Sequence, residues 1–505
     1  MSRRDPLILF ILALAVNFTV AAFVHEPRYS DDFYYFGGAL RLAAGAGFTE
    51  PYFWNYVGAP NALPQPSHLY WMPLTSILAA VSMTLLGHNF AAARLPLVLA
   101  ASLLPVGAYL IGWNIDHLRR HALSAGLLTV FCGYYVGYWA TTDSFAVFGV
   151  SASASLLALG LMIERNDWRL ELGAGVGAGL AHLARADGLL VVLVGLVISL
   201  WRWRKSSNPI RQIGLLLSGY VIVMLPWFVR NTWAVGSPLG GGGLNTIWLV
   251  EYNDLFRYPN ELTAARYFAA GWPIILQSKW EAIVINLQHI LGEQMLIFLA
   301  PLIVIGLWQL RHRPLYQPVW LYALGLYAAM TLVFTFPGPR GGLFHSGAAL
   351  LPAYMAAALV GLDSAVNWIA VRRKDWRADI AKRNFSGMAV VLAMGLTLTL
   401  TTSIVAQWNG SGDLFRQIVA DLPSAAVVMS NNPPGVWVAT DHSGIPLVAG
   451  DVTELLAAAD RYSVAYVLLD QNHTLGLEEL YQTESAERLR LVKKVGAWKV
   501  FEVVR

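Results

Sequence analysis

Two adjacent carboxylates, Asp31 and Asp32, follow the first long apolar segment and are well suited to acid–base chemistry. A general base that activates a hydroxyl group must lie within hydrogen-bond reach, with its ionisation set by its neighbours. The simpler interpretation is that the pair caps a helix expected over residues 33–44, because aspartate is favoured at helix N-termini. The pattern alone favours capping slightly. The two roles are compatible, since one aspartate can cap the helix while the other stays free.

Three arginines, Arg185, Arg230 and Arg340, lie at the ends of apolar segments, where each could hold a phosphate group. A guanidinium stays charged and grips phosphate oxygens through paired hydrogen bonds. The alternative, favoured for any one arginine alone, is a side chain that extends to the membrane interface. That alternative loses force on the outer side of a membrane, where basic residues are disfavoured. A single outward-facing cavity could gather the polar residues at these segment ends. They also include Asp143, Asp187, Asn231 and His345.

Histidine, cysteine and glycine residues give little indication of a cofactor. His68 and His345 have no partner at the spacing of metal ligands, and both are interpreted as polar interfacial residues. Cys132 is the one cysteine, so the chain has no internal disulfide and no cysteine-based metal site. The glycines at 240–243 follow no strand and open no GxGxxG pattern, which argues against a nucleotide site. We expect no cofactor and no metal ligand, with a divalent cation left open.

A run of aromatic residues follows the first apolar segment. It comprises Tyr52, Phe53, Trp54, Tyr56, Tyr70 and Trp71. This run is typical of an aromatic belt at a membrane interface. Stacking on a sugar ring is the weaker alternative.

The composition places these residues in a membrane protein. Of 505 residues, 56% are apolar and 13% are charged, about half the charged share of soluble domains. A bilayer solvates apolar helix faces, so such a composition does not require an oversized water-excluded core. The net charge is only +4, and the basic residues stand in short clusters between apolar segments. This pattern indicates topology signals and argues against nucleic-acid binding.

About 11 spans are expected, each from roughly 20 apolar residues. They lie at 7–24, 94–113, 121–138, 143–163, 170–183, 188–203, 210–229, 282–310, 318–336, 346–370 and 387–406. The basic clusters then share one side, taken as cytoplasmic, if 170–203 is a hairpin that turns at 184–188. The apolar segment 71–86 would invert this arrangement, so we expect it in the outer interface. The result is a multi-pass protein of the cell membrane with a cytoplasmic N-terminus.

The last part of the chain, residues 407–505, has a soluble composition. Strands are expected at 425–429, 465–470 and 497–504, and helices at 452–461 and 477–490, which indicates a small α/β domain. Acidic residues outnumber basic ones here, which fits an outer location. The expected architecture is therefore an α-helical membrane domain over 1–406, with outer loops at about 25–93 and 231–281, followed by an extracytoplasmic domain over 407–505.

The order and spacing of several short stretches resemble the family 39 glycosyltransferases, bacterial relatives of the protein O-mannosyltransferases within the GT-C superfamily. The stretches lie at 30–48, 86–96, 184–188, 226–238 and 431–434. The first, which begins Ser-Asp-Asp-Phe-Tyr-Tyr, is similar to the acidic motif and amphipathic helix of that family's first outer loop. The resemblance covers most of the chain and implies a GT-C-like membrane domain with a soluble tail.

The resemblance also implies a chemistry. The donor would be a sugar on a polyprenyl-phosphate lipid, displaced with inversion onto an unidentified protein, lipid or glycan acceptor. Asp31 would act as the base, with Asp32 as its partner, and no nucleotide would be needed. The departing lipid phosphate would be held by Arg185, Arg230 and Arg340. The remaining candidates for substrate-binding residues are Tyr35, His68, Asp187, Asn231 and His345.

Two departures from the family pattern concern the phosphate contacts. Gln65 stands where some relatives place a lysine, and His345 stands where they often carry an arginine. His345 replaces that cation only when it is protonated.

Three other functions stay open. A lipid or small-molecule transporter would also place charges within the membrane, but the sequence lacks the internal repeat expected of one. The spans could instead anchor a functional tail, or the chain could be an inactive relative. Asp31→Asn separates the transferase from the transporter, because only the transferase needs that carboxylate for its chemistry.

Overall fold

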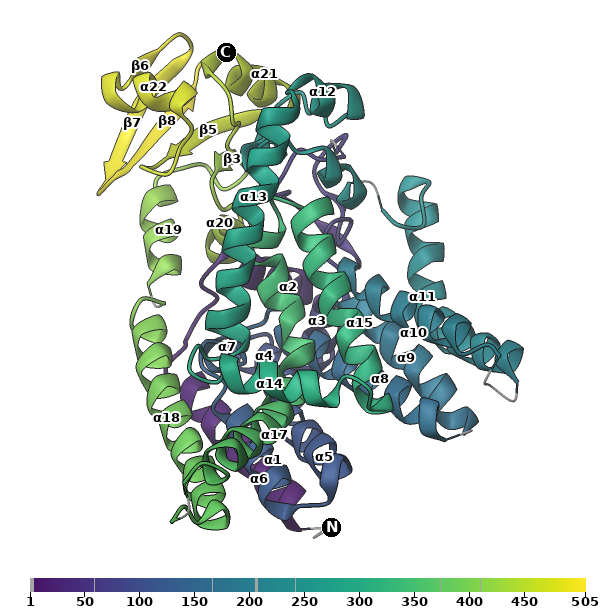
Figure 1. Cartoon of the computed structure of the whole chain (residues 1–505). Coiled ribbons are helices and arrows are strands. Elements are labelled where there is room, and N and C mark those ends of the chain that lie inside the picture. Colours follow the sequence, from purple (N-terminus) through teal and green to yellow (C-terminus); the bar gives the residue numbers. More distant parts are fainter. Residues whose placement is uncertain are drawn as a thin grey trace.

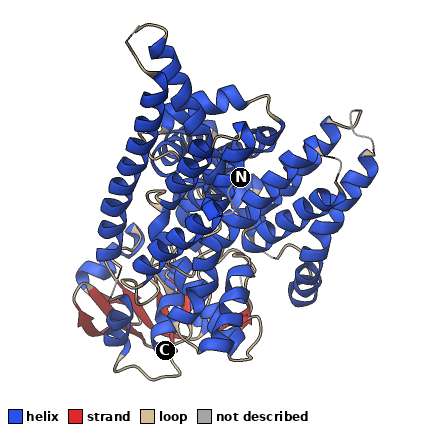
Figure 2. Ribbon diagram, turned by 90° about the horizontal axis from the view of Figure 1, so that it is seen from below, coloured by secondary structure: helices blue, strands red, loops and turns tan. Residues whose placement is uncertain are grey.

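The computed structural model describes residues 4–58, 60–165, 167–204, 208–240, 242–373, 375–408 and 410–505. It is a long body of helices with a small sheet at one end (Figure 1). A view from below shows the strands confined to one region beside the helices (Figure 2). Four residues of the sequence patterns lie outside the described residues, namely Arg3, Lys205, Gly241 and Lys374. The expected fold class, a helical membrane protein with a C-terminal α/β part, is confirmed.

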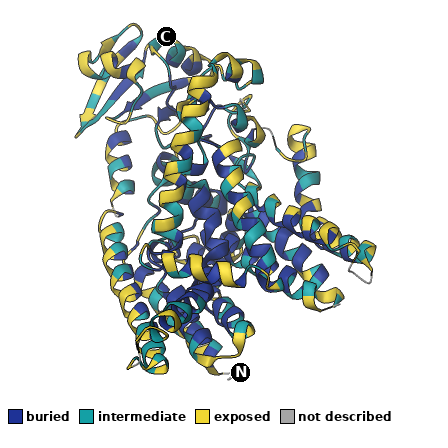
Figure 3. Ribbon diagram, in the orientation of Figure 1, coloured by how far each residue is buried: buried dark blue, intermediate teal, exposed yellow. Residues whose placement is uncertain are grey.

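Long helices make up the membrane body. They are α1 (Arg4–Ala21), α4 (Phe90–Ala101), α5 (Leu104–Asp116), α6 (Arg119–Val130), α8 (Phe145–Glu164), α9 (Trp168–Ala184), α10 (Leu189–Trp201), α11 (Pro209–Val235), α13 (Trp272–His289), α14 (Ala300–Leu310), α15 (Gln317–Ala328), α17 (Leu351–Ala370) and α18 (Ala378–Ala406). Among the described residues, 6 helical segments are long and apolar enough to cross a membrane. Their outer faces expose apolar side chains, including Leu7 and Ile11 on α1 and Leu398 on α18 (Figure 3). The chain is a multi-pass membrane protein, since lipid solvates these faces.

Three expected spans are wrong as single helices. In 121–138, α6 ends at Val130 and the chain turns at Gly133, which has a φ of +68°. In 282–310, a π-helical turn at Ile290–Gln294 and two residues with positive φ separate α13 from α14. In 318–336, α15 passes into a π-helical turn at Ala329–Val333. Hydropathy cannot reveal such breaks, because irregular backbone is tolerated at membrane depth when it is buried in protein.

The expected hairpin is present. Helices α9 and α10 are joined by the turn η1 (Ala186–Gly188). A Cβ atom at Gly188 would lie 2.3 Å from the backbone carbonyl of Ala181, so the tight turn requires glycine. The segment expected in the interface forms α3 (Leu74–Leu86), whose 13 residues span about 20 Å, too short for the roughly 30 Å hydrocarbon core.

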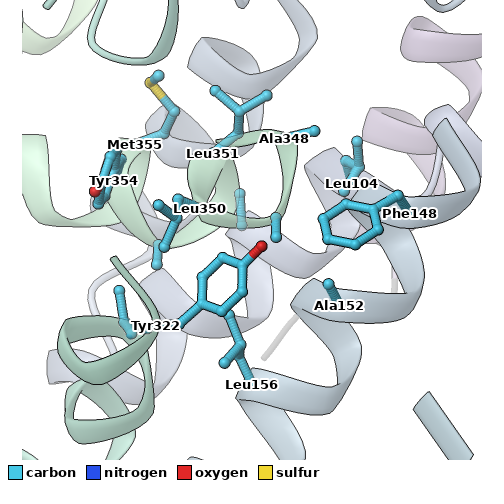
Figure 4. Packing of buried hydrophobic residues seen from close by; sticks show 14 of the residues in the cluster. Leu104, Phe148, Ala152, Leu156, Tyr322, Ala348, Leu350, Leu351, Tyr354 and Met355 are labelled. Atoms are coloured by element: carbon cyan, nitrogen blue, oxygen red, sulfur yellow. The ribbon is translucent and has the colours of Figure 1, made fainter. Parts of the chain in front are cut away.

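The core of the membrane body lies where α5, α8, α15 and α17 meet. Leu104, Phe148, Leu156, Tyr322 and Leu351 are among the residues buried there (Figure 4). The Tyr322 hydroxyl donates to the Ser346 carbonyl at 3.1 Å, which satisfies its polar atom within the apolar interior. This core fixes the start of α17 and the short helices before it.

Shorter elements connect the long helices. They are α2 (Ser30–Ala43), β1 (Thr49–Glu50), β2 (Gln65–Pro66), α7 (Tyr135–Tyr138), η2 (Gly243–Trp248), η3 (Tyr252–Phe256), α12 (Ala264–Ala269), η7 (Gly338–Gly342), α16 (Leu343–Gly347) and η8 (Ala348–Leu350), with η5 (Pro314–Tyr316) between α14 and α15.

The C-terminal part contains a six-stranded mixed sheet with the order β4-β3-β5-β8-β7-β6. Its elements are α19 (Ser411–Val419), β3 (Val427–Ser430), α20 (Pro433–Thr440), β4 (Gly444–Pro446), α21 (Val452–Tyr462), β5 (Val464–Leu469), η9 (Leu475–Leu477), α22 (Glu478–Thr483), β6 (Ser485–Ala486), β7 (Leu489–Val495) and β8 (Trp498–Val503). The helix expected over 477–490 is wrong beyond Thr483. Glu484 and Arg488 have positive φ, so α22 stops and a β-hairpin follows.

The sheet is joined to the loop between β1 and β2. Tyr52 forms an isolated parallel bridge with Gly444, and the Tyr56 hydroxyl donates to the Pro446 carbonyl at 2.8 Å. Helix α20 packs against α2. The Trp437 ring on α20 also lies 5.5 Å from the ring of Tyr52, in the loop after β1. The C-terminal part therefore braces the helix that carries Asp31.

Candidate functional site

Asp31 and Asp32 occupy the first turn of α2 rather than its N-cap, which is Tyr29 and makes no side-chain capping bond. The capping interpretation is therefore wrong in its strict form. Asp32 is fully buried and accepts hydrogen bonds from the backbone N–H groups of Arg28, at 3.1 Å, and Thr142, at 2.7 Å. These bonds tie the start of α2 to the loop before α8. Asp31 keeps 26% of its side chain exposed and is the carboxylate that faces outward.

Asp31 lies beside a buried histidine–aspartate pair. His345 Nε2 is 2.8 Å from Asp143 Oδ2 and 3.9 Å from Asp31 Oδ2. His345 is fixed by a hydrogen bond of 2.7 Å between its Nδ1 and the Gly341 carbonyl, and by stacking on Phe145 at 3.8 Å. We call Asp31, Asp143 and His345 the outer cluster. Three segments that are far apart in sequence thus meet at one point.

The surroundings raise the pKa of Asp31 to about 7. Burial is the largest cause and the negative charge of Asp143 is the next, while His345 and Arg185 act in the opposite direction. A carboxylate with a pKa near the working pH is well matched to general-base catalysis. Asp31 is therefore both accessible and poised for proton transfer.

Arg185 is held at the floor of the same site. Its Nε donates to Asp187 at 3.1 Å and to the Ser346 hydroxyl at 3.2 Å, and its Nη1 donates to the Ser144 hydroxyl at 3.3 Å. Ser144 also hydrogen-bonds Tyr35, which is buried on α2. Asp187 orients the guanidinium through these contacts. Among the described residues, Nη2 of Arg185 has no hydrogen-bond partner and remains available to an anion.

Arg340 lies at the rim of the site. Its guanidinium is 4.4 Å from the centre of the Tyr252 ring, and the charge of Asp31 acts on the Tyr252 hydroxyl. Arg340 is exposed and makes no hydrogen bond or ion pair with the residues that the structure describes. The rim therefore offers a second cation that is free to meet a ligand.

Two predicted site residues lie apart from the outer cluster. Arg230 donates to the Phe48 carbonyl at 2.8 Å and to Asn231 Oδ1 at 2.9 Å, and it packs over the Trp227 ring at 4.7 Å. Asn231 in turn donates to the Pro238 carbonyl at 3.2 Å. The Arg230 guanidinium thus holds the loop that contains Phe48, and none of these contacts involves Asp31.

His68 is buried among neutral hydrogen-bonding groups. Its Nδ1 is 2.8 Å from the Ser67 hydroxyl, and its Nε2 is 2.9 Å from the Ser76 hydroxyl. Burial and the charge of Arg230 lower the pKa of His68 to about 3, so the ring stays neutral. His68 is therefore a buried packing residue of the loop between α2 and α3, and the expectation of a residue at the membrane interface is wrong.

The expectation that His345 has no partner at metal-ligand distance is wrong. One ligand atom each from Asp31, Asp143 and His345 lies within 4.8 Å of the others. Two carboxylates and an imidazole are a donor set that divalent cations such as Zn²⁺ or Mn²⁺ accept. His345 and Asp143 also bond each other directly, so this pair needs no ion. The arrangement is therefore compatible with a site that holds a cation and with one that does not.

Comparison with known proteins agrees with this arrangement. Residues 66–228 match the family described as dolichyl-phosphate-mannose-protein mannosyltransferase. The crystal structure of ArnT from Cupriavidus metallidurans bound to undecaprenyl phosphate superposes with a TM-score of 0.60 at 15% identity, covering 100% of this chain and 99% of that one. This chain is therefore similar to that family over residues 66–228. Its fold is similar to that of ArnT over the whole chain.

Two further similar proteins match over part of the chain or with a lower TM-score. The undecaprenyl phosphate-alpha-4-amino-4-deoxy-L-arabinose arabinosyl transferase of Pseudomonas aeruginosa (strain UCBPP-PA14) is 25% identical over 235 residues, which are 45% of this chain. The match spans only 40% of that relative's length. The apo oligosaccharyltransferase of Archaeoglobus fulgidus has a TM-score of 0.52 at 12% identity, over 95% of this chain and 70% of that one.

Sequence reasoning missed several partners in the candidate site. The Tyr29 hydroxyl donates to Asp143 at 2.9 Å, and burial and the charge of Asp31 raise the pKa of the Tyr70 and Tyr252 hydroxyls, yet none of the three was singled out for the site. Asp143 was recognised only as a polar residue at a segment end. The only signal in the sequence was that these residues stand at the ends of apolar segments. This predicts that they lie at a similar depth in the membrane, but not which of them contact each other.

Proposed function

We propose that this chain is a membrane glycosyltransferase that transfers a sugar from a polyprenyl-phosphate donor to an acceptor hydroxyl at the outer face of the cell membrane, with inversion. The observation that carries the proposal is the partly exposed Asp31 carboxylate, 3.9 Å from His345 and beside the arginine floor. The donor class is supported by two structural relatives, one described as bound to undecaprenyl phosphate and one as in complex with a dolichol-phosphate.

In the proposed mechanism Asp31 removes the proton of the acceptor hydroxyl. The acceptor oxygen attacks the anomeric carbon from the side opposite the lipid phosphate, and the bond from that carbon to the phosphate oxygen breaks. The lipid phosphate leaves with the electron pair and the configuration inverts. The proton stays on Asp31 until it passes to solvent. His345 lies next to Asp31 and lowers its pKa, against the effects of burial and of the Asp143 charge.

Cations for the departing phosphate are supplied by Arg185 and Arg340. Preorganised donors that meet developing charge are usually the largest contribution to catalysis. Arg185 is fixed by Asp187, Ser144 and Ser346, so it requires little reorganisation when charge develops. The Arg230 guanidinium already donates to the Phe48 carbonyl and to Asn231. We therefore assign Arg230 to positioning the loop that contains Phe48, and not to binding the phosphate. His345 and Tyr35 line the substrate side of this arrangement.

The outer location is supported by the distribution of charge. The described basic residues at 119–120 and 372–373 connect α5 to α6 and α17 to α18 at the end of the body that holds the N-terminus, away from the sheet (Figure 1). Basic loops are typically cytoplasmic. The N-terminus is then cytoplasmic, and the Asp31 site and the domain over 407–505 face outward. The two domains are proposed as 1–406 and 407–505.

The test is transfer from a panel of radiolabelled polyprenyl-phosphate sugars by purified protein in nanodiscs, with host membranes as acceptor. Wild type, Asp31→Asn and a control, Asp441→Asn, are compared. Asp441 is exposed and has a φ of 60°, a conformation that asparagine tolerates well. Label transferred by wild type and the control but not by Asp31→Asn supports the proposal. No transfer from any donor by folded wild type would contradict it and favour a transporter or an inactive relative.

A further inference from the structure

Helix α13, which runs along the body from the end near the sheet (Figure 1), brings polar side chains into an apolar segment. Asn286 and His289 on α13, and Glu293 on the π-helical turn after it, lie within the segment 282–310. Polar and ionisable residues are costly in such a segment and often have a functional role. The same helix exposes apolar side chains such as Trp280, as expected of a face toward lipid. The proposed mechanism uses none of the three polar residues.

Asn286 contacts the irregular chain between α15 and α16. It is fully buried, and its Nδ2 donates to the Met330 carbonyl at 3.1 Å and to the Thr331 hydroxyl at 3.0 Å. These bonds hold the π-helical turn at Ala329–Val333. A Cβ atom at Gly338 would lie 2.0 Å from the Met330 carbonyl oxygen, so η7 packs directly on this backbone. Asn286 therefore fixes the support on which η7 lies.

His289 holds η7 itself. Its Nε2 is 3.2 Å from the Pro339 carbonyl, and since a carbonyl oxygen can only accept, Nε2 carries a proton and donates it. Its Nδ1 is 2.8 Å from Glu293 Oε1. The hydrogen bond made by one ring nitrogen of a histidine sets the role of the other. Glu293 therefore orients the ring so that Nε2 meets the Pro339 carbonyl.

The far end of η7 is held from the same side. Gln294, which ends the π-helical turn after α13, is buried, and its Nε2 donates to the Leu343 carbonyl at 3.4 Å. The chain then passes through Leu296 and Ile297, whose φ values of 50° and 51° are unfavourable for these side chains. Strained backbone persists only where its surroundings hold it, and it is frequent near functional sites. These features indicate that the end of α13 is placed to support η7.

Arg340 depends on η7 for its position. It follows Pro339 directly, and Gly341 after it has a φ of +113°, a conformation that favours glycine. Arg340 makes no hydrogen bond or ion pair with the described residues, and its guanidinium packs against the Tyr252 ring at 4.4 Å. Its place at the rim of the site is therefore set mainly by the backbone of η7, which His289 holds.

We infer that His289, oriented by Glu293, is a positioning residue for the transfer reaction. Through the Pro339 carbonyl it sets Arg340 at the rim of the site, where the lipid phosphate departs. It acts through η7 and not by contact with the substrate. The inference rests on the proposed function, because that function gives Arg340 a phosphate to bind.

The experiment is a double-mutant cycle on kcat/KM for transfer by the full chain in nanodiscs, with His289→Ala, Arg340→Ala and both changes together. We expect His289→Ala to lower kcat/KM about tenfold, since a misplacement of about 1 Å can cost up to about 10²-fold. In the Arg340→Ala protein the same change should cost less than about twofold, because the group that His289 positions is gone.

Two further variants sharpen the cycle. His289→Gln should recover most of the loss, because its amide can still donate to the Pro339 carbonyl. The control Gln277→Ala changes an exposed residue of the same helix, whose amide bonds Glu281 on that helix, and it should match wild type. Should His289→Ala fail to fold, His289→Asn takes its place, because asparagine keeps part of the ring's volume and not its reach.

The inference is overturned if folded His289→Ala keeps kcat/KM within twofold of wild type. It is also overturned if the loss is as large in the Arg340→Ala protein as in wild type, since His289 would then act elsewhere. Should wild type transfer nothing, the proposed function fails, and hydrogen–deuterium exchange over residues 338–347 decides the positioning on its own. Faster exchange in His289→Ala than in wild type and Gln277→Ala supports the hold on η7, and equal exchange in all three overturns it.

Discussion

Two clusters in different parts of the helical body each place a histidine near two aspartates, and they are built differently. In the inner cluster, His121 on α6 hydrogen-bonds Asp116 through Nδ1 and Asp363 on α17 through Nε2, the latter at 3.0 Å. Arg120 also binds Asp363. In the outer cluster, one nitrogen of His345 serves both carboxylates, at 2.8 Å and 3.9 Å.

The difference lies in whether every carboxylate has a close partner. Asp116 and Asp31 are similarly exposed, at 28% and 26% of their side chains. Asp116 makes a direct bond to His121, whereas Asp31 stands beyond hydrogen-bond distance from His345. Satisfied ion pairs hold helices together, and a carboxylate without a close partner is available to a substrate. The same residue types thus give a clamp at the inner end and a candidate base at the outer end.

The largest expected effect is on activity and follows from Asp31→Asn. The variant retains the shape of the side chain but cannot accept a proton, so transfer should fall by about 10²–10⁴-fold. Thermal unfolding should stay near that of wild type, because Asp31 makes no close ion pair. Initial rates of labelled sugar transfer, at equal amounts of folded protein, provide the check. A loss below threefold would mean that Asp31 is not the base.

A smaller effect is expected from His345→Gln. Glutamine can preserve a hydrogen bond to Asp143 but removes the positive charge that lowers the pKa of Asp31. The pKa of Asp31 should therefore rise, and transfer near neutral pH should fall about tenfold while recovering at higher pH. The readout is the rate as a function of pH in both proteins. An unchanged profile would show that His345 does not act on Asp31.

The inner cluster should affect stability and leave the chemistry unchanged. Asp363→Asn removes the shared partner of Arg120 and His121, and leaves two cations near each other. We expect a loss of about 1–3 kcal/mol in unfolding free energy, seen as a lower midpoint in thermal denaturation of the detergent-solubilised protein. Transfer per folded molecule should match wild type. A selective loss of activity without loss of stability would contradict the clamp.

Much of the fold could be predicted because hydropathy reports directly on membrane helices. The hairpin of α9 and α10 followed from the basic loops, and the short α3 followed from its length. The break at Gly133 could not be predicted, since the Thr397 hydroxyl from α18 satisfies the freed Gly133 N–H at 2.9 Å. A local pattern carries no information on such a distant partner.

The sequence allowed us to predict which residues lie in the candidate site, but not which of them contact each other. Asp31 and Arg185 came from segment ends and family resemblance, and they lie in one site. Asp143 and His345 are 202 residues apart, so only the packed helices bring them together. Arg230 looked equivalent to Arg185 in sequence, yet the Phe48 carbonyl and Asn231 occupy its guanidinium. That difference depends on tertiary contacts alone.

The pH dependence of kcat/KM for sugar transfer tests the central claim most directly. Because the pKa of Asp31 is raised to about 7, the base is ionised above this pH and becomes protonated below it. Wild type should therefore lose activity as the pH falls through about 7, and the residual activity of Asp31→Asn should lack this acid limb. An acid limb with the same midpoint in Asp31→Asn would show that another group is the base and would contradict the account.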